Sequence, residues 1–328
     1  MCLPVNCKEV IKLHELEIKL QEAIEASCTV AIAGHVNPDG DAIGACFALA
    51  AYLDGLGKNV AVLLENCDPK YDIIPGKHYI FQGSYDKLTP DLFIALDSST
   101  PDRLGKAEAV MYRAKTTAMF DHHMNNTIAA DIRIVDANAP STTLMLYDYM
   151  SKRANIDITI ATAIYAGLVY DTGGFRHSST TPKALEVAGK LMQTGFDFTK
   201  VYTTILLEKP RSKTRLYAEA IARIAYAEAG IAYTYITLED KAKYQGEYPS
   251  GVIDYLTTIR GVTTAIYATE KDDHVEVSLR SSIANVGELA TSLGGGGHRA
   301  AAGFSSKGEP LQIINDILPR LQAELTSL

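Results

Sequence analysis

Long apolar runs and secretory signals are both absent from this sequence. The longest nearly uninterrupted apolar stretch, residues 42–53, contains Gly44 and is well short of the ~20 residues that a membrane helix needs. The first ten residues lack the basic start, apolar middle and small-residue cleavage site of a signal peptide. The sequence therefore argues against a membrane protein, and we expect a cytoplasmic one.

Cysteine is scarce, and there is no excess of positive charge. The five cysteines lie within residues 2–67 and show neither a CxxC pair nor the spacing of zinc ligands, so we expect reduced thiols. Lys and Arg total 31 against 39 Asp and Glu, which gives a net charge of −8. Proteins that bind long nucleic acids through many phosphates usually carry a basic surface. The composition therefore favours a small or short anionic ligand over a long duplex.

The length and the hydrophobic pattern predict an α/β fold in two domains. A chain of 328 residues corresponds to about two domains of ~150 residues each. In the first half, short apolar runs alternate with helical stretches, which predicts a mainly parallel sheet covered by helices on both faces. The predicted strands are residues 29–33, 60–64, 92–96, 117–120 and 132–135.

Polar side chains follow three of these strands at the point where each strand ends. Ligands of open α/β sheets bind beyond the carboxyl ends of the strands, so we expect these side chains to meet at one edge. A further carboxylate, Asp171, ends the helical stretch 158–170. The side chains after the strands are His35, Asp39 and Asp41 after the first, Asp97 after the third, and Asp121, His122 and His123 after the fourth.

Beyond residue 190 such polar clusters stop, and a smaller C-terminal α/β domain is predicted. Its strands are expected at residues 231–238, 263–268 and 275–279, with helical stretches around Ile253 and Leu289. The segment before it is rich in Lys and Arg and is broken by Pro210. We predict a first domain over 1–190, a linker over 191–210 and a second domain over 211–328.

The gathered carboxylates predict a metal centre. Four carboxylates that converge without a cation would repel one another and raise each other's pKa values. Asp39, Asp41, Asp97 and Asp171 carry four negative charges, which two divalent cations would balance. A set of carboxylate and imidazole ligands without thiolate favours manganese over a structural zinc. Two such ions would clamp the oxygens of a phosphoryl transfer and lower the pKa of a bridging water, which predicts phosphoester hydrolysis.

Each aspartate taken alone is more often a helix cap or a turn residue, so the prediction depends on the whole set. The set resembles the DHH phosphoesterases, and the matching segments follow the order of that family from about residue 30 to 305. The family often has Ser after Gly44 and an aromatic residue after Arg176, where this chain has Ala45 and His177. The matching segments are His35-Val-Asn-Pro-Asp39-Gly-Asp41-Ala-Ile-Gly44, Leu96-Asp97-Ser98-Ser99, Asp121-His122-His123 with Asn126, Asp171-Thr172-Gly173-Gly174-Phe175, and the glycine-rich segment 294–304 of the associated C-terminal domain.

The resemblance implies a role for each residue. It implies that the first domain is catalytic and the second binds substrate, with His123 acting on the phosphate as a general acid or charge stabiliser. Asp121 would fix the tautomer of a histidine. Apart from the resemblance, Arg103 lies six residues after Asp97 and would either reach a phosphate or form a surface ion pair. One Mn²⁺ ion would be bound by His35, Asp39 and Asp97, the other by Asp41, Asp97, His122 and Asp171, and substrate by Arg280, Gly295, Gly296, Gly297 and His298.

The resemblance also implies an activity. It implies manganese-dependent hydrolysis of short oligoribonucleotides to mononucleotides and removal of the 3′-phosphate from adenosine 3′,5′-bisphosphate (pAp). A phosphodiesterase of linear or cyclic dinucleotides would share every metal ligand and stays open. So does a non-catalytic nucleotide sensor, although none of the expected ligands is missing. The sequence leaves a homodimer open as well.

Overall fold

The first sheet consists of strands in which apolar residues occupy consecutive positions. All five residues of the central strand β3 are buried, as expected for a strand covered on both faces. The strands are all parallel, in the order β2-β1-β3-β4-β5, which confirms the predicted parallel sheet. They are β1 (Thr29–Ala33), β2 (Asn59–Leu63), β3 (Leu92–Leu96), β4 (Thr116–Asp121) and β5 (Ile132–Val135).

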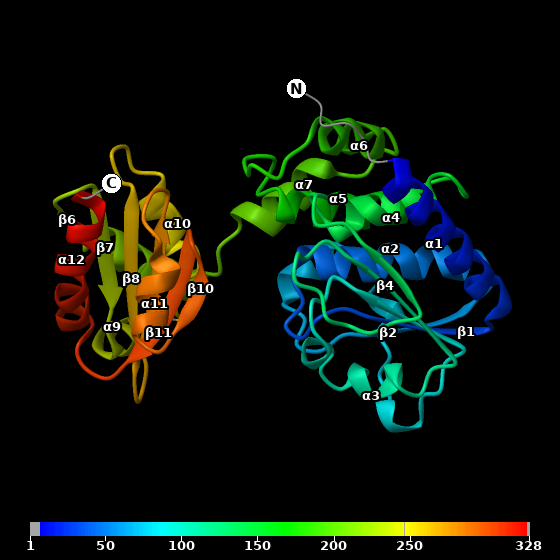
Figure 1. Cartoon of the computed structure of the whole chain (residues 1–328), viewed down its shortest axis with the longest axis horizontal. Coiled ribbons are helices and arrows are strands. Elements are labelled where there is room, and N and C mark those ends of the chain that lie inside the picture. Colours follow the sequence, from blue (N-terminus) through cyan, green and yellow to red (C-terminus); the bar gives the residue numbers. More distant parts are fainter. Residues whose placement is uncertain (1–6, 246, 327–328) are drawn as a thin grey trace. The chain divides into compact units, whose positions relative to one another are not determined.

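The computed structural model describes residues 7–326 apart from residue 246, with side chains from residue 13 onward. The chain divides between Glu208 and Lys209 into two compact units (Figure 1). In the part of the chain that is described, no helix combines the length and the apolar character needed to span a membrane.

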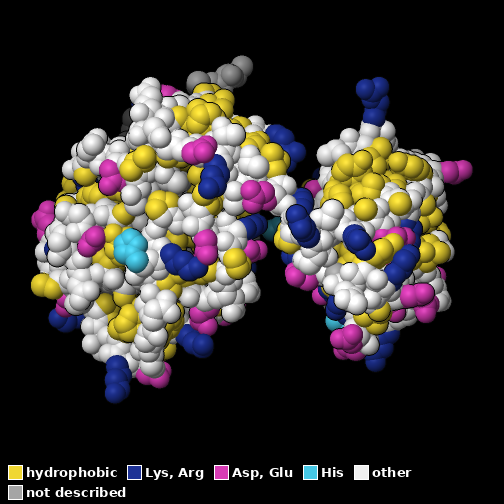
Figure 2. Space-filling view, turned by 180° about the vertical axis from the view of Figure 1, so that it is seen from behind, with side chains coloured by type: hydrophobic (Ala, Val, Ile, Leu, Met, Phe, Trp, Pro, Cys, Tyr) yellow, Lys and Arg dark blue, Asp and Glu magenta, His cyan; other side chains and the backbone are white. Residues whose placement is uncertain are grey.

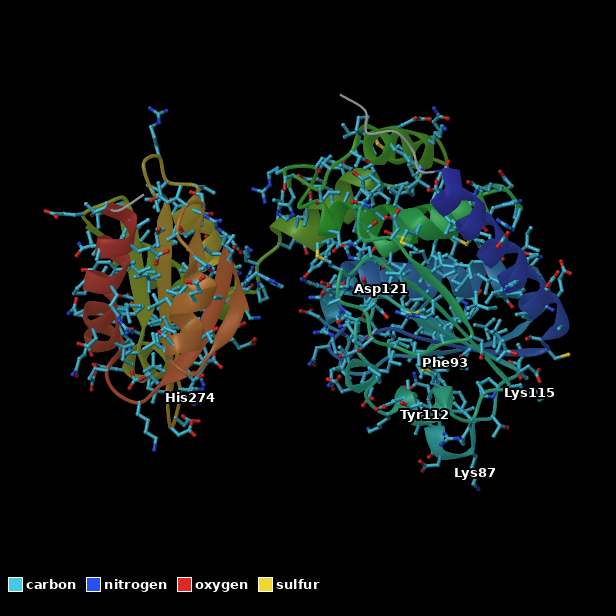
Figure 3. All side chains as sticks on the ribbon, viewed as in Figure 1. Lys87, Phe93, Tyr112, Lys115, Asp121 and His274 are labelled. Atoms are coloured by element: carbon cyan, nitrogen blue, oxygen red, sulfur yellow. The ribbon has the colours of Figure 1, made fainter. Side chains whose placement is uncertain are left out.

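Helices cover both faces of the first sheet. Alternate residues of β3 point to opposite sides: Ile94 packs in the larger core beneath α2, α4 and α5, and Phe93 packs in the smaller core beside α3 (Figures 1 and 3). The helices of this unit are α1 (Cys7–Ala26), α2 (Gly40–Gly55), α3 (Ala107–Met111), α4 (Thr142–Met150), α5 (Ile158–Asp171), α6 (Pro182–Met192) and α7 (Phe198–Tyr202). Shorter turns are η1 (Pro69–Ile73), η2 (Lys77–Tyr79), η3 (Tyr85–Lys87), η4 (Pro101–Leu104) and the π-helical η5 (Thr203–Leu207).

The segment 191–210, where a linker was predicted, is largely folded onto the first unit. It contains α7 and η5, whose side chains Val201 and Ile205 are buried in the larger core. These apolar side chains find partners there, so the division of the chain falls later, after Glu208. The Lys and Arg residues in and just after this segment favoured an exposed linker in the sequence and gave no sign of the buried side chains.

Two glycines allow α2 to lie very close to α5. A methyl group on Gly44 of α2 would stand 2.4 Å from the backbone carbonyl oxygen of Ala163 in α5. A methyl group on Gly167 of α5 would stand 2.4 Å from Cγ2 of Thr143 and 2.5 Å from Oδ1 of Asp41. The close approach therefore brings the start of α2, the start of α4 and the second half of α5 to one place.

The second unit is a six-stranded mixed sheet in the order β10-β11-β9-β8-β7-β6, in which only β7 and β8 pair in parallel. One face packs against α11 and α12, and the other against α8 and α10. The predicted smaller α/β domain is confirmed as a fold. The elements are α8 (Arg211–Ala222), β6 (Ala225–Ala227), β7 (Ile231–Ile236), α9 (Leu238–Tyr244), α10 (Val252–Thr257), β8 (Thr264–Glu270), β9 (Val275–Ser281), α11 (Val286–Ser292), β10 (Gly296–His298), β11 (Ala301–Ser306) and α12 (Pro310–Thr326).

The Gly44 contact can be tested within one helix. We expect Gly44→Ala to lower the free energy of unfolding of the first unit by about 1–3 kcal/mol, because a backbone carbonyl cannot move aside as a side chain can. Gly55→Ala, at the end of the same helix, meets nothing within 4 Å and should leave stability unchanged or slightly raised. Urea unfolding of both variants measures the difference, and equal stabilities would contradict the close contact.

Candidate metal centre

The side chains expected to bind metal lie together at the carboxyl edge of the first sheet. His35 follows β1, Asp97 follows β3, and the Asp121-His122-His123 segment begins at the end of β4, where Figure 3 labels Asp121. Asp41 lies in the first turn of α2, and Asp171 is the last residue of α5. Several separate elements therefore deliver carboxylates and imidazoles to one place, as predicted for an open parallel sheet.

His35, Asp39 and Asp97 form the first group that could hold a metal ion. Asp39 caps α2: its Oδ1 accepts the amide protons of Asp41 and Ala42 at 2.9 and 3.1 Å. Its other oxygen, Oδ2, then lies 3.6 Å from Nε2 of His35. The same nitrogen is 3.9 Å from Oδ2 of Asp97. One carboxylate thus ends a helix with one oxygen and faces the site with the other.

Asp97 lies between the two groups. Its Oδ1 is 3.5 Å from Nε2 of His122, and its Oδ2 faces His35. The residue has a positive φ of 51°, a left-handed conformation that is uncommon outside glycine and occurs at functional sites. Its amide donates to the carbonyl of Phe120 at 3.0 Å, which holds the turn against β4. The chain therefore bends sharply at the residue that faces both histidines.

Asp41, His122 and Asp171 form the second group that could hold a metal ion. Nε2 of His122 lies 3.1 Å from Oδ2 of Asp171. That oxygen is buried and has no hydrogen-bond partner among the described residues. Asp41 is completely buried, although it carries a carboxylate. An unpaired buried oxygen beside a second buried carboxylate fits a site for a cation.

The tautomers of His35 and His122 also fit a metal-binding site. Nδ1 of His35 lies 2.9 Å from the carbonyl of Val36, and Nδ1 of His122 lies 3.2 Å from the carbonyl of Ala139. A carbonyl only accepts, so each Nδ1 carries the proton. In a neutral histidine Nε2 then offers a lone pair toward the carboxylates. Once its protons are displaced, every group at the centre can donate an electron pair, which is the donor set that a divalent cation requires.

Charge repulsion at the centre shows in the pKa values. Burial, followed by the charge of Asp171, raises the pKa of Asp41 from 3.8 to about 8. Burial and the charge of Asp41 also raise the pKa of Asp97. Burial opposes protonation of His122, but the adjacent carboxylates outweigh it and raise its pKa to about 10. The centre thus attracts positive charge, whether a proton or a metal ion.

His123 is oriented by a buried carboxylate. Its Nδ1 donates to Oδ1 of Asp121 at 2.7 Å, and Asn126 donates to the other oxygen at 2.6 Å. Burial would raise the pKa of Asp121, but these two hydrogen bonds outweigh burial and lower it. The His123 side chain is 46% exposed, and its Nδ1 lies 3.8 Å from Oδ1 of Asp97. The imidazole is therefore fixed at one nitrogen and accessible at the edge of the centre.

Two arginines lie beside the centre. The carbonyl of Arg103, in η4, accepts the amide proton of Val36 at 2.7 Å, so η4 lies beside the loop of His35. The exposed Arg103 side chain makes no ion pair or hydrogen bond within the described residues, which leaves it available to a phosphate. Arg176 instead donates through Nε to the carbonyl of Gly173 and supports the loop after α5.

Apart from Arg103, the residues predicted to bind substrate lie in the second unit. Gly295–His298 are exposed and include strand β10. Side chains at Gly295 and Gly297 would collide with the backbone of β11, so strand pairing already explains these two glycines, whereas a methyl group on Gly296 would meet nothing. Arg280 lies on β9 opposite Ala301 of β11, and its Nε is 3.9 Å from Asp254. Of the glycines in this set, Gly296 is the one without a structural explanation.

One functional feature was missed in the sequence. The first turn of α4 donates hydrogen bonds to Asp41 from the amides of Thr142 and Thr143 and from the Thr143 hydroxyl, and to Asp97 from the Thr142 hydroxyl. The only signal was Ser141 before an apolar run, which indicates a helix start and caps α4. Nothing local showed that the turn would meet Asp41 from a distant segment.

The fold and the centre define a metal-dependent phosphoesterase, and the comparisons agree. The N-terminal domain of the DHH family matches residues 29–168, and the DHHA1 domain matches residues 228–326. A bifunctional oligoribonuclease and PAP phosphatase of Thermus thermophilus is 31% identical, over 90% of each chain. The chain therefore belongs to the DHH family, which confirms the resemblance seen in the motifs.

Two further proteins are similar to the chain. A cyclic-di-AMP phosphodiesterase of Geobacillus thermodenitrificans is 29% identical over 92% of this chain. The matched region covers 48% of the length of that relative. The crystal structure of an exopolyphosphatase-related protein from Bacteroides fragilis has the same fold, with a TM-score of 0.86 and 22% identity over 95% of this chain and 98% of the other.

Repulsion at the centre leads to a prediction about stability and pH. Asp41 and Asp97 bind protons more tightly when folded than when unfolded, so the metal-free protein should lose stability as the pH rises from about 4 to 8. Asp97→Asn removes one charge and should raise the free energy of unfolding at pH 8 by about 1–2 kcal/mol, with a smaller gain at pH 5.

Urea unfolding with a chelator present measures this effect, with Glu22→Gln on the exposed face of α1 as the control. Added Mn²⁺ should stabilise the wild type and the control, but not Asp97→Asn. A metal-free Asp97→Asn protein that is less stable than the wild type at pH 8 would show that the carboxylates do not repel one another.

Proposed function

We propose that this chain is a manganese-dependent phosphoesterase that hydrolyses short oligoribonucleotides to mononucleotides and removes the 3′-phosphate from pAp. The observation that carries the proposal is the convergence around Asp97 of carboxylate and imidazole groups that could hold metal ions. The Thermus thermophilus relative is named for both activities, and this chain covers 90% of its length. We also propose that the protein is located in the cytoplasm.

The two groups would hold two Mn²⁺ ions, with Asp97 facing both. His35 and Asp39 would complete one site, and Asp41, His122 and Asp171 the other. Oxygen and imidazole donors without a thiolate suit manganese. When bound, the two ions would neutralise the substrate phosphate and lower the pKa of the water that attacks phosphorus.

His123 would act on the substrate. Its Nδ1 is held by Asp121, so its Nε2 is the atom left to face the phosphate, either to give a proton to the leaving oxygen or to stabilise charge on the phosphate. The free side chain of Arg103, beside the loop of His35, would bind a phosphate oxygen. In the second unit, Arg280, Gly296 and His298 would bind the nucleotide through a charged side chain and an open backbone.

The charge distribution favours short substrates. The net charge is −8, and on the face in Figure 2 the basic side chains of the first unit are scattered among acidic ones. A long nucleic acid would need a continuous basic track. One or a few phosphates, in contrast, can be held by the metal ions and Arg103.

A second candidate is a phosphodiesterase of linear or cyclic dinucleotides. The Geobacillus thermodenitrificans relative carries that activity in its name, at 29% identity. The same metal ligands would serve, because the reaction at phosphorus is the same. The two candidates differ in what the substrate-binding residues accept.

Hydrolysis assays test the proposal directly. Protein with added Mn²⁺ is given RNA of two to five nucleotides, pAp, a linear dinucleotide and a cyclic dinucleotide. We expect turnover of short RNA and pAp, and none by the triple variant Asp121→Ala, His122→Ala, His123→Ala. Turnover of cyclic dinucleotide alone would favour the second candidate, and binding of all substrates without turnover would make the protein a sensor.

His123 can be tested apart from the metal ligands. We expect His123→Gln to lower kcat by about 10²- to 10⁴-fold, the range for loss of a general acid, while Mn²⁺ still stabilises the protein. His14→Gln, exposed on α1, is the control and should keep full activity. Full activity of His123→Gln would exclude the proposed role, and loss of the Mn²⁺ effect would make His123 a metal ligand.

The substrate role of the second unit has its own test. Arg280→Ala should raise KM for pAp by about 10- to 100-fold through loss of one charge-assisted hydrogen bond, with a smaller change in kcat. Arg320→Ala, exposed on α12, is the control. An unchanged KM in Arg280→Ala would show that β9 does not contact the substrate.

A further inference from the structure

The first turn of α4 forms a cradle around the carboxylate of Asp41. The amide of Thr142 donates to Oδ2 at 2.6 Å, and the amide of Thr143 donates to Oδ1 at 3.1 Å. The hydroxyl of Thr143 donates to the same Oδ1 at 2.6 Å. Each oxygen of a completely buried carboxylate therefore receives at least one backbone N–H at the positive end of a helix.

This cradle is complementary to the ionised form of Asp41 and not to the protonated form. A backbone N–H only donates, so a proton on either carboxylate oxygen would point at a donor. The cradle thus supplies hydrogen-bond donors to an aspartate that is wholly removed from solvent.

The Thr143 hydroxyl has a fixed direction. A carboxylate accepts, so the Thr143 proton points at Asp41, and the Ser141 hydroxyl, 2.9 Å away, must then donate to Thr143 Oγ1. Ser141 in turn accepts the amide proton of Leu144 at 3.1 Å. The Thr143 methyl group lies against Gly167, where an added methyl group would stand 2.4 Å from it. The hydroxyl of Thr143 therefore forms hydrogen bonds, whereas its methyl group packs against α5.

We propose that Thr143 is a positioning residue that holds the carboxylate of Asp41 in place beside His122 and Asp171, so that the second metal ion can bind. The inference depends on the proposed metal-dependent function and adds a residue that contacts neither metal nor substrate. The hydroxyl serves metal affinity, and the methyl group serves packing between α2, α4 and α5. Hydrogen bonds to metal ligands of this kind typically change metal affinity by about 10- to 100-fold.

Paired substitutions separate the two roles. Thr143→Val keeps the shape and removes the hydroxyl, whereas Thr143→Ser keeps the hydroxyl and removes the methyl group. We expect Thr143→Val to lower the affinity of one Mn²⁺ site by about 10- to 100-fold with an unchanged melting temperature of the metal-free protein. Thr143→Ser should keep Mn²⁺ affinity but melt at a lower temperature.

Binding of Mn²⁺ alone, followed by electron paramagnetic resonance of the free ion, gives a readout independent of activity. Thr162→Val is the matched control, because the Thr162 hydroxyl donates to the Ile158 carbonyl within α5 and contacts no carboxylate. If Thr143→Val folds poorly, Thr143→Ala against Thr143→Ser gives the same hydroxyl difference. High Mn²⁺ should restore pAp hydrolysis by Thr143→Val, since the defect lies in affinity.

Wild-type Mn²⁺ affinity in Thr143→Val would overturn the inference. Equal loss in Thr143→Val and Thr143→Ser would also overturn it, because the shape and not the hydroxyl would then matter. In both cases the wild type binds two ions and the proposed function stands. A wild-type protein that binds no Mn²⁺ would instead overturn the proposed function, and the role of Thr143 with it.

Discussion

The first unit must accommodate the mutual repulsion of buried carboxylates, and many of its features follow from this constraint. Asp41 and Asp97 are almost entirely removed from solvent; burial and the charge of Asp171 raise the pKa of Asp41, and burial and the charge of Asp41 raise the pKa of Asp97. The surrounding fold offsets this repulsion locally: the amino end of α4 donates to Asp41, and the amino end of α2 donates to one oxygen of Asp39. Those contacts satisfy hydrogen bonds but supply no full positive charge. A divalent cation does, which is why binding, stability and chemistry are coupled at this edge of the sheet.

The same constraint explains features that are otherwise unfavourable. A left-handed Asp97 and glycines at a helix crossing both lower intrinsic stability, yet each brings a carboxylate to where the others are. Asp121 shows the contrasting solution. It is buried as deeply, but two donors lower its pKa, and it serves to hold His123. At this edge of the sheet, Asp41 and Asp97 thus need a cation, whereas hydrogen bonds from the protein satisfy Asp121.

Much of this could be predicted from the sequence, because parallel strands and their carboxyl ends follow from hydrophobic pattern alone. The strand after Cys28 and the placement of Asp97 needed no tertiary information. The cradle on α4 could not be predicted, because Ser141 indicates only a helix start, and its partner Asp41 lies about a hundred residues earlier. Strands β6, β10 and β11 are short or rich in Gly, Ala and Ser, so they carry little β signal and form only because β7, β8 and β9 are there to pair with. The buried side chains of α7 were likewise hidden by charged neighbours.

The residues of the centre are contributed in the order β1, α2, β3, β4 and α5, so the last of them, Asp171, arrives only when most of the first unit has been made. A ribosome-bound chain that ends before α5 has an incomplete set and lacks the helix that presses α2 into place. The metal centre is therefore complete only when the first unit has been made as far as the end of α5.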